Sequence, residues 1–262
     1  MATRAARLRA AWVRRIRRAP IRYTDRYGLT YRLHPTDDLE LYFRHHGWFE
    51  VGEQEFCRRY LRPGMTAVDV GAYIGMYSCL MASLVGPTGR VHAFEPSPEA
   101  FARLRDSIHL NRLTNVVANR CVVFSGRATL PLFLYAPPFQ SLNSVVHGEL
   151  ERGATVMRPQ SAIVAEAVSL DEYCAEHAID RIDFLKLDAE GAELEVVTGA
   201  ARLLERAAIR ALLLEVGAGA ERVRERLETC KFRFFTVDGD GSITPAPAGG
   251  VLRAANVVAL RD

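Results

Sequence analysis

The fold of this chain is decided by the stretch Thr66-Ala67-Val68-Asp69-Val70-Gly71-Ala72-Tyr73-Ile74-Gly75. Its first half is a short run of apolar and β-branched residues, which predicts a buried strand. The two glycines predict a tight turn, and the apolar stretch over 76–85 predicts a helix. A strand, a glycine turn and a helix in this order bring the backbone close to a nucleotide-like ligand.

A second signal follows about 20 residues later, where such folds place an acid that binds ribose hydroxyls. The apolar run over 91–94 ends there in Glu95, and Pro96 comes next. Each signal is weak alone, but the pair at this spacing predicts a cofactor site at the ends of two neighbouring strands.

The rest of the chain alternates predicted strands with predicted helices. The strands are predicted over 90–95, 116–123, 164–168, 182–188, 209–216, 232–237 and near 255–260, and the helices over 98–111, from 169, 194–205 and 221–230. This alternation predicts an α/β fold: a three-layer, Rossmann-like arrangement whose sheet is mostly parallel with an antiparallel last strand. Residues 128–135 are interpreted as an extra hairpin strand, and 136–162 as an insertion without a regular period.

The domain organisation predicted from the sequence is one arm and one domain. Residues 1–22 contain eight arginines and no acid, and we interpret them as a solvated basic arm, with a membrane-surface or partner-docking helix as the alternative. Residues 23–262 form the domain, in which 23–65 are an N-terminal cap region and 66–262 the core. The cap region is predicted to hold a hairpin over 21–33 and a helix over 53–61.

The composition is that of an ordinary globular enzyme, with 262 residues of which 49% are hydrophobic and 25% charged. The net charge of +3 lies largely in the arm, so no nucleic-acid surface is expected. The five cysteines have no zinc-ligand spacing, and no stretch reaches the ~18 apolar residues of a membrane span. These features predict a cytoplasmic protein without a nucleic-acid partner, and they leave a homo-oligomer open.

The glycine spacing selects among cofactors. A dinucleotide fingerprint needs a middle glycine, which is absent between Gly71 and Gly75. Asp69 suits a positively charged ammonium group, and Glu95 suits two ribose hydroxyls. S-adenosylmethionine has both groups and no phosphate, which favours a methyltransferase over an NAD-dependent oxidoreductase. A non-catalytic binding protein that retains the fold is the third interpretation.

A second constellation lies in the predicted strand over 182–188. Lys186 and Asp188 point to the same face, and a lysine there is costly to bury unless it is paired. Asp188 or Glu190 is predicted to act as a general base on a hydroxyl, and Asp188 with Glu215 is an alternative site for a hard cation such as Mg²⁺. Glu190 is equally interpreted as an acid at a helix start. Glu50, ahead of the helix over 53–61, faces the cofactor pocket or lies in a solvated loop.

Three stretches together resemble the FkbM-type family of class I methyltransferases over roughly residues 48–217. They are the sequences VDVGAYIG at 68–75, GRVHAFEP at 89–96, and SLD at 169–171 followed by IDFLKLDAEGAE at 182–193. The element Trp48-Phe49-Glu50 also resembles the family's aromatic-acid element before the first strand.

The resemblance implies a seven-stranded sheet and S-adenosylmethionine-dependent O-methylation of a hydroxyl on a sugar or natural product, with Mg²⁺ in some relatives. It implies Asp69, Gly71, Gly75 and Glu95 as cofactor contacts, and Asp188 and Glu190 at the acceptor. Lys186, as the partner of Asp188, completes the predicted catalytic set. The predicted cofactor set is completed by Ala72, Tyr73, Pro96 and Glu50. Two positions depart from the family pattern: Tyr73 stands where Asn is common, and 124–126 stand where a Ser-Asp pair often follows the third strand.

Overall fold

The computed structural model describes residues 20–34, 42, 45–47, 49–137, 139–146, 148, 150–152, 155–215, 219–246 and 256–261. The predicted arm over 1–22 therefore lies outside the described residues except for its last three positions. Within the described ranges, none of the helices combines the length and the apolar character needed to cross a membrane.

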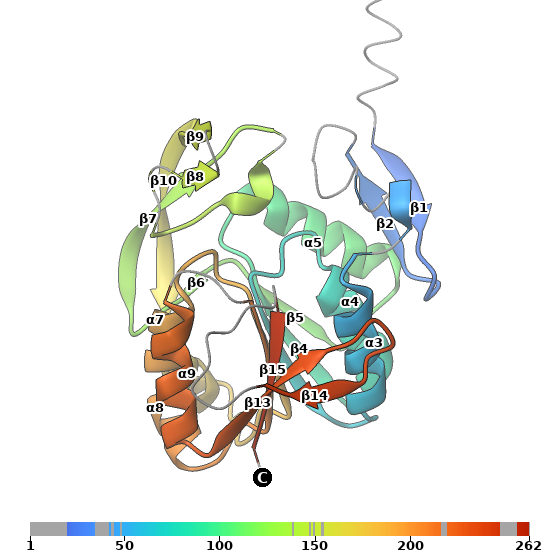
Figure 1. Cartoon of the computed structure of the whole chain (residues 1–262). Coiled ribbons are helices and arrows are strands. Elements are labelled where there is room, and N and C mark those ends of the chain that lie inside the picture. Colours follow the sequence, from blue (N-terminus) through green and yellow to red (C-terminus); the bar gives the residue numbers. More distant parts are fainter. Residues whose placement is uncertain are drawn as a thin grey trace, which may run out of the picture.

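A central sheet of eight described strands forms the middle layer (Figure 1). Across the sheet the order is β14 (Ile243–Pro245), β13 (Phe232–Val237), β15 (Asn256–Arg261), β12 (Ala211–Glu215), β11 (Phe184–Leu187), β3 (Thr66–Val70), β4 (Arg90–Phe94) and β5 (Val116–Asn119). The strands from β12 to β5 are parallel, and β15 is antiparallel to both of its neighbours. The predicted α/β class with an antiparallel last strand is confirmed, and β14 adds a strand to the seven that the resemblance implied.

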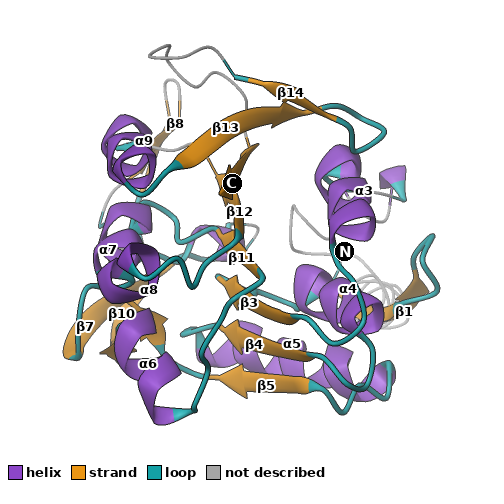
Figure 2. Cartoon of the chain, turned by 90° about the horizontal axis from the view of Figure 1, so that it is seen from below, coloured by secondary structure: helices purple, strands orange, loops and turns teal. Residues whose placement is uncertain are grey.

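Helices cover both faces of this sheet, as Figure 2 shows. One face packs against α3 (Val51–Tyr60), α4 (Met76–Val85) and α5 (Pro98–Leu110), and the other against α6 (Leu170–Glu176), α7 (Glu193–Thr198), α8 (Ala201–Glu205) and α9 (Ala220–Thr229). Side chains alternate along β3, so Ala67 joins the α3–α4 core while Val68 and Val70 join the core under α6–α9. Burial on both faces explains why these strands are almost continuously apolar.

The helices follow their local sequence signals with one exception. α6 begins with a capping box, in which the Ser169 side chain accepts from the Glu172 amide and Glu172 reaches back to the Ser169 amide, as predicted. The single helix predicted over 194–205 was wrong, because the chain forms α7 and α8 with a break at Gly199. A Cβ at Gly199 would lie 2.1 Å from the Phe124 carbonyl oxygen, so only glycine permits this approach.

A second, smaller sheet stands beside the main one. It has the order β6 (Val122–Val123), β10 (Ser161–Val168) and β7 (Ala128–Leu134). The single strand predicted over 116–123 was wrong, because it divides into β5 of the main sheet and β6 of this one. β10 is longer than the strand predicted over 164–168. The insertion, predicted without a period, holds η1 (Gln140–Leu142), β8 (Leu150–Arg152) and β9 (Thr155–Met157).

The predicted N-terminal hairpin is present as β1 (Ile21–Thr24) and β2 (Thr30–Leu33), which pair antiparallel. It is fixed to the end of α5 by Asn111, whose side chain accepts from the Thr30 amide at 2.7 Å and donates to the Thr30 carbonyl at 2.8 Å. Figure 1 shows this hairpin and the β7–β10 segment on opposite sides of the upper part of the molecule.

Candidate active site at the carboxyl ends of the strands

A cavity of about 420 Å³ lies where β3, β4, β11 and β12 end. These strands bring Gly71, Glu95, Asp188 and Glu215 to its wall. The insertion supplies another wall through residues 140–145. The volume falls within the ~300–1,000 Å³ of small-molecule pockets, and the position is the one at which open α/β sheets bind ligands.

The glycine turn after β3 is shaped by two close approaches. Gly71 has φ +79°, and a Cβ there would lie 1.8 Å from the Asp188 carbonyl oxygen, so the loops after β3 and β11 touch through it. The amides of Gly71 and Ala72 both donate to the Phe94 carbonyl, at 3.0 and 2.9 Å. Gly75 has φ +88° and packs against Leu104 of α5. Gly71 thus lines the cavity, whereas Ala72 and Gly75 shape the turn from outside the lining.

Glu95 is the acid that organises this turn. One of its carboxylate oxygens accepts from the Tyr73 amide and the other from the Ser97 amide, both at 2.8 Å. Its side chain lines the cavity although the residue is only 6% exposed, and Pro96 lines the cavity beside it. Burial raises the pKa of Glu95 to about 8.

Tyr73, which departs from the family pattern, has a structural role in the glycine turn. Its φ of 48° is left-handed, and the Glu95 hydrogen bond holds its amide in that conformation. Its ring lies under the guanidinium of Arg103, 5.2 Å from the ring centroid, and also borders the cavity.

Asp69 and Glu50, both predicted as cofactor contacts, lie differently with respect to the cavity. Asp69 is fully buried, lies outside the cavity lining and accepts a hydrogen bond from Ser78 of α4. Glu50 lines the cavity, where its carboxylate accepts from the Tyr77 hydroxyl at 2.7 Å and from the Asn256 side chain at 2.8 Å. Burial raises the pKa of both acids. Glu50 thus presents a carboxylate to the cavity, whereas Asp69 does not.

Lys186 is a buried cation that interacts electrostatically with several acids. Its Nζ donates to the Asp188 carboxylate at 2.7 Å and lies 4.9 Å from the ring centroid of Tyr77. The lysine side chain is 5% exposed and that of Asp188 30% exposed, so Asp188 alone of the pair opens to the cavity. Burial lowers the pKa of Lys186, but the carboxylates of Asp188, Glu50 and Asp69 together raise it above its ordinary value. The lysine is therefore charged.

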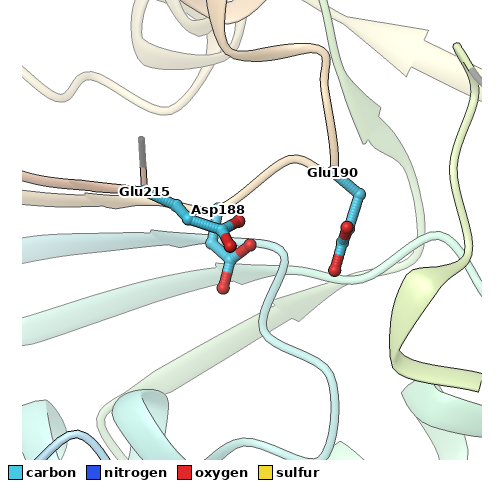
Figure 3. Close-up of side chains that lie close together, drawn as sticks. All are labelled: Asp188, Glu190 and Glu215. Carbon is cyan, nitrogen blue, oxygen red and sulfur yellow. The ribbon is translucent and has the colours of Figure 1, made fainter. Parts of the chain in front are cut away.

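Three carboxyl groups lie together in the wall of the cavity. Figure 3 shows Asp188 beside Glu215, with Glu190 facing the same space from the next turn. Oxygen atoms of the three groups lie within 4.8 Å of one another. Burial raises the pKa of Asp188, but Lys186 and a hydrogen bond with Glu215 bring it below its ordinary value. Burial and the Asp188 charge raise the pKa of Glu215, so the proton of this pair resides on Glu215.

Two residues that the sequence reasoning missed hold the turn after Asp188. Glu193, which is 4% exposed, accepts from the amides of Ala189 and Gly191 at 3.0 and 3.1 Å. Ser144 of the insertion donates to the Glu190 carbonyl at 2.8 Å, and Glu190 has a left-handed φ of 47°. The acid three residues after Glu190 was the readable signal for the first contact. Ser144 carried none, because it is 46 residues away in the chain.

Comparisons with known proteins identify the family of this chain. The model of the methyltransferase FkbM domain family matches residues 69–234. A region of this chain is 32% identical over 161 residues to the 31-O-demethyl-FK506 methyltransferase FkbM of Streptomyces tacrolimicus, covering 53% of this chain and 60% of that protein. The chain is also 28% identical over 144 residues to Methyltransferase 1 of Beauveria bassiana, and this match covers 50% of this chain and 57% of that protein.

A more distant relative is the hexuronic acid methyltransferase AglP of Haloferax volcanii, 25% identical over 173 residues, covering 65% of this chain and 64% of that protein. The crystal structure of a methyltransferase FkbM from Methylobacillus flagellatus superposes with a TM-score of 0.48 at 16% identity, covering 79% of this chain and 50% of that one. The chain thus spans less than two thirds of the length of the curated relatives named here. Because the family model matches well over half of the residues, this chain belongs to the FkbM methyltransferase domain family.

Proposed function

We propose that this chain is an S-adenosylmethionine-dependent O-methyltransferase that acts on a hydroxyl of a sugar or natural-product small molecule. The observation that carries the proposal is that one cavity joins the Glu95 turn with an ionised Asp188 held by a buried lysine. The first group suits an adenosine ribose, and the second suits a hydroxyl proton.

The cavity fits a cofactor that has a ribose and an ammonium group and no phosphate. Glu95 offers carboxylate lone pairs to ribose hydroxyls, and Glu50 offers a carboxylate to an ammonium group. In a dinucleotide-binding fold the pyrophosphate lies against backbone amides of the glycine turn, and a middle glycine makes room for it. The turn between Gly71 and Gly75 has no such glycine, which disfavours the NAD-dependent alternative.

The chemistry asked of the chain is modest. S-adenosylmethionine supplies a methyl group that is already activated on a sulfonium sulfur. The chain must align the acceptor oxygen with that methyl group and take its proton as the new carbon–oxygen bond forms and the carbon–sulfur bond breaks. Asp188 is placed to take the proton, because Lys186 keeps it ionised and its side chain opens to the cavity.

Methyl transfer itself is tested by incubating the full chain with S-adenosylmethionine and a panel of hydroxyl acceptors. S-adenosylhomocysteine and a product heavier by one methylene unit, detected by mass spectrometry, are the expected result. Cofactor binding without transfer to any member of the panel would instead favour the non-catalytic interpretation.

Glu95 predicts a pH dependence of cofactor affinity. Its pKa is raised to about 8, so the carboxylate is largely protonated at neutral pH and gains acceptor capacity as the pH rises. Affinity of the wild type relative to Glu95→Gln should therefore increase by up to about tenfold between about pH 7 and 9. Taking the ratio cancels the titration of the cofactor. A ratio that is flat or falls with pH contradicts the assignment of Glu95 to the ribose.

Mg²⁺ at Asp188 and Glu215 stays a prediction. The three carboxylates are suitable ligands for a hard cation. However, Lys186 already pairs with Asp188, and Glu215 would have to lose its proton before it could bind a cation. We therefore expect EDTA to change turnover by less than about twofold. Turnover that EDTA abolishes and added magnesium restores would show the metal-dependent version to be correct.

A further inference from the structure

The described lining residues include five acids, Glu50, Glu95, Asp188, Glu190 and Glu215, and no lysine, arginine or histidine. The other polar groups that the insertion contributes are uncharged, namely Gln140, Ser141, Asn143 and Ser144. An anionic ligand would find hydrogen-bond donors in this cavity but no cation with which to pair.

The buried lysine does not change this balance at the cavity surface. Lys186 is 5% exposed, lies outside the lining and is shared among three carboxylates that it faces. Glu50 and Glu95 belong to the donor side in the proposed function. Asp188, Glu190 and Glu215 therefore remain at the acceptor end, where Lys186 keeps Asp188 ionised.

The apolar part of the lining lowers the local dielectric constant around these charges. Leu132, Leu142 and Val145 border the same cavity as the acids. A carboxylate or phosphate of the acceptor that entered beside Asp188 would lose its hydration and meet a like charge at short range, where repulsion is stronger than in water. A hydroxyl has no charge to desolvate, and an ammonium group of the acceptor would exchange its hydration for an ion pair with Asp188.

We propose that this cavity selects acceptors that carry hydroxyls without a carboxylate or phosphate, and that it prefers acceptors in the order amine-bearing, neutral, anionic. The inference rests on the proposed function and narrows its substrate class. The proposed acceptor class therefore differs from the acidic sugar in the name of the Haloferax relative, a hexuronic acid methyltransferase.

A matched set of acceptors tests the order directly. Methyl glucosaminide, methyl glucoside and methyl glucuronide share one ring and differ in charge. We expect kcat/KM for the glucoside to exceed that for the glucuronide by at least about tenfold at low salt. Glu190→Gln should narrow this gap, and Glu205→Gln, an exposed acid on α8, should leave it unchanged. A glucuronide methylated as well as the glucoside overturns the proposal.

A second measurement requires no methyl transfer. Cys121 lines the cavity, and the other four cysteines are buried. The selectivity ratio is the rate constant for modification of Cys121 by a cationic methanethiosulfonate divided by that for an anionic one. This ratio should be at least about tenfold higher in the folded chain than in urea. Equal ratios overturn the charge selectivity whatever the reaction is. The expected ratio combined with no methylated acceptor leaves the selectivity standing and contradicts the proposed function. Protection by S-adenosylhomocysteine shows that the reagents enter through this cavity.

Discussion

Replacing Asp188 with asparagine is expected to lower turnover by about 10²- to 10³-fold and to leave affinity for S-adenosylmethionine within about threefold. Asparagine keeps the size of the side chain and an oxygen for Lys186, but it cannot accept the hydroxyl proton. Single-turnover kinetics with any methylated acceptor, together with calorimetric titration of the cofactor, measure the two quantities separately.

The matched control is Asp240→Asn, which removes a carboxylate from the exposed turn between β13 and β14. Asp240 pairs with Arg59 at 3.3 Å, and its side chain is 66% exposed. This variant should behave as the wild type in both assays. If Asp188→Asn also keeps turnover near the wild-type value while its melting temperature is unchanged, Asp188 is not the base.

Replacing Lys186 with methionine is expected to destabilise the fold by about 3–5 kcal/mol near pH 8. The substitution leaves the buried carboxylates of Asp69 and Asp188 without their cation. Each acid then has a pKa raised by burial, so the folded state binds protons more tightly than the unfolded state. Stability should therefore fall as the pH rises, and the loss should be smaller near pH 5 than near pH 8. Urea denaturation at the two pH values measures it.

Arg226→Met provides the comparison for Lys186→Met. Arg226 pairs with Glu205 at 3.6 Å, but both side chains are exposed, at 40% and 66%. Its removal should cost less than about 1 kcal/mol. The role of Lys186 as the shared counter-ion would be contradicted if Lys186→Met lowered the free energy of unfolding no more than this control does. It would also be contradicted if that decrease did not depend on pH.

The sequence alone was sufficient for the parts of the fold that depend on local periodicity. The glycine turn, the acid at the end of β4 and the alternation of strands with helices predicted the parallel sheet and the edge that holds the cavity. Ligands of such sheets bind at the carboxyl ends of the strands. Glu95, Asp188 and Glu215 were therefore brought together in the prediction as they are in the structure.

Pairings between distant segments could not be read from the sequence. Residues 116–123 have the composition of one strand, and they divide because Val122 and Val123 pair with β10, more than 40 residues away in the sequence. The approach of Gly199 to the Phe124 carbonyl is of the same kind. Local propensity contains no information about such partners.

The position of Asp69 could have been predicted better from the alternation of side chains along a strand. It was assigned to the cofactor because it precedes the glycine turn. Side chains alternate along a strand, however, so Asp69 points with Ala67 toward α4 and meets Ser78 there. Its role as a cofactor contact stays a prediction, for which Glu50 has the better position. The signal for Glu50 was ambiguous, because Tyr77 and Asn256 lie far from it in the chain.

Calorimetric titration with S-adenosylmethionine tests the central claim most directly, namely that the cavity at the strand ends is the site of the methyl donor. The wild type should bind one equivalent, and Glu95→Ala should weaken binding by at least about tenfold near pH 9, where the ionised carboxylate accepts the ribose hydroxyls. Glu176→Ala, at an exposed acid on α6, should bind as the wild type does. Absence of binding by the wild type, or equal affinity of a folded Glu95→Ala, would contradict the account.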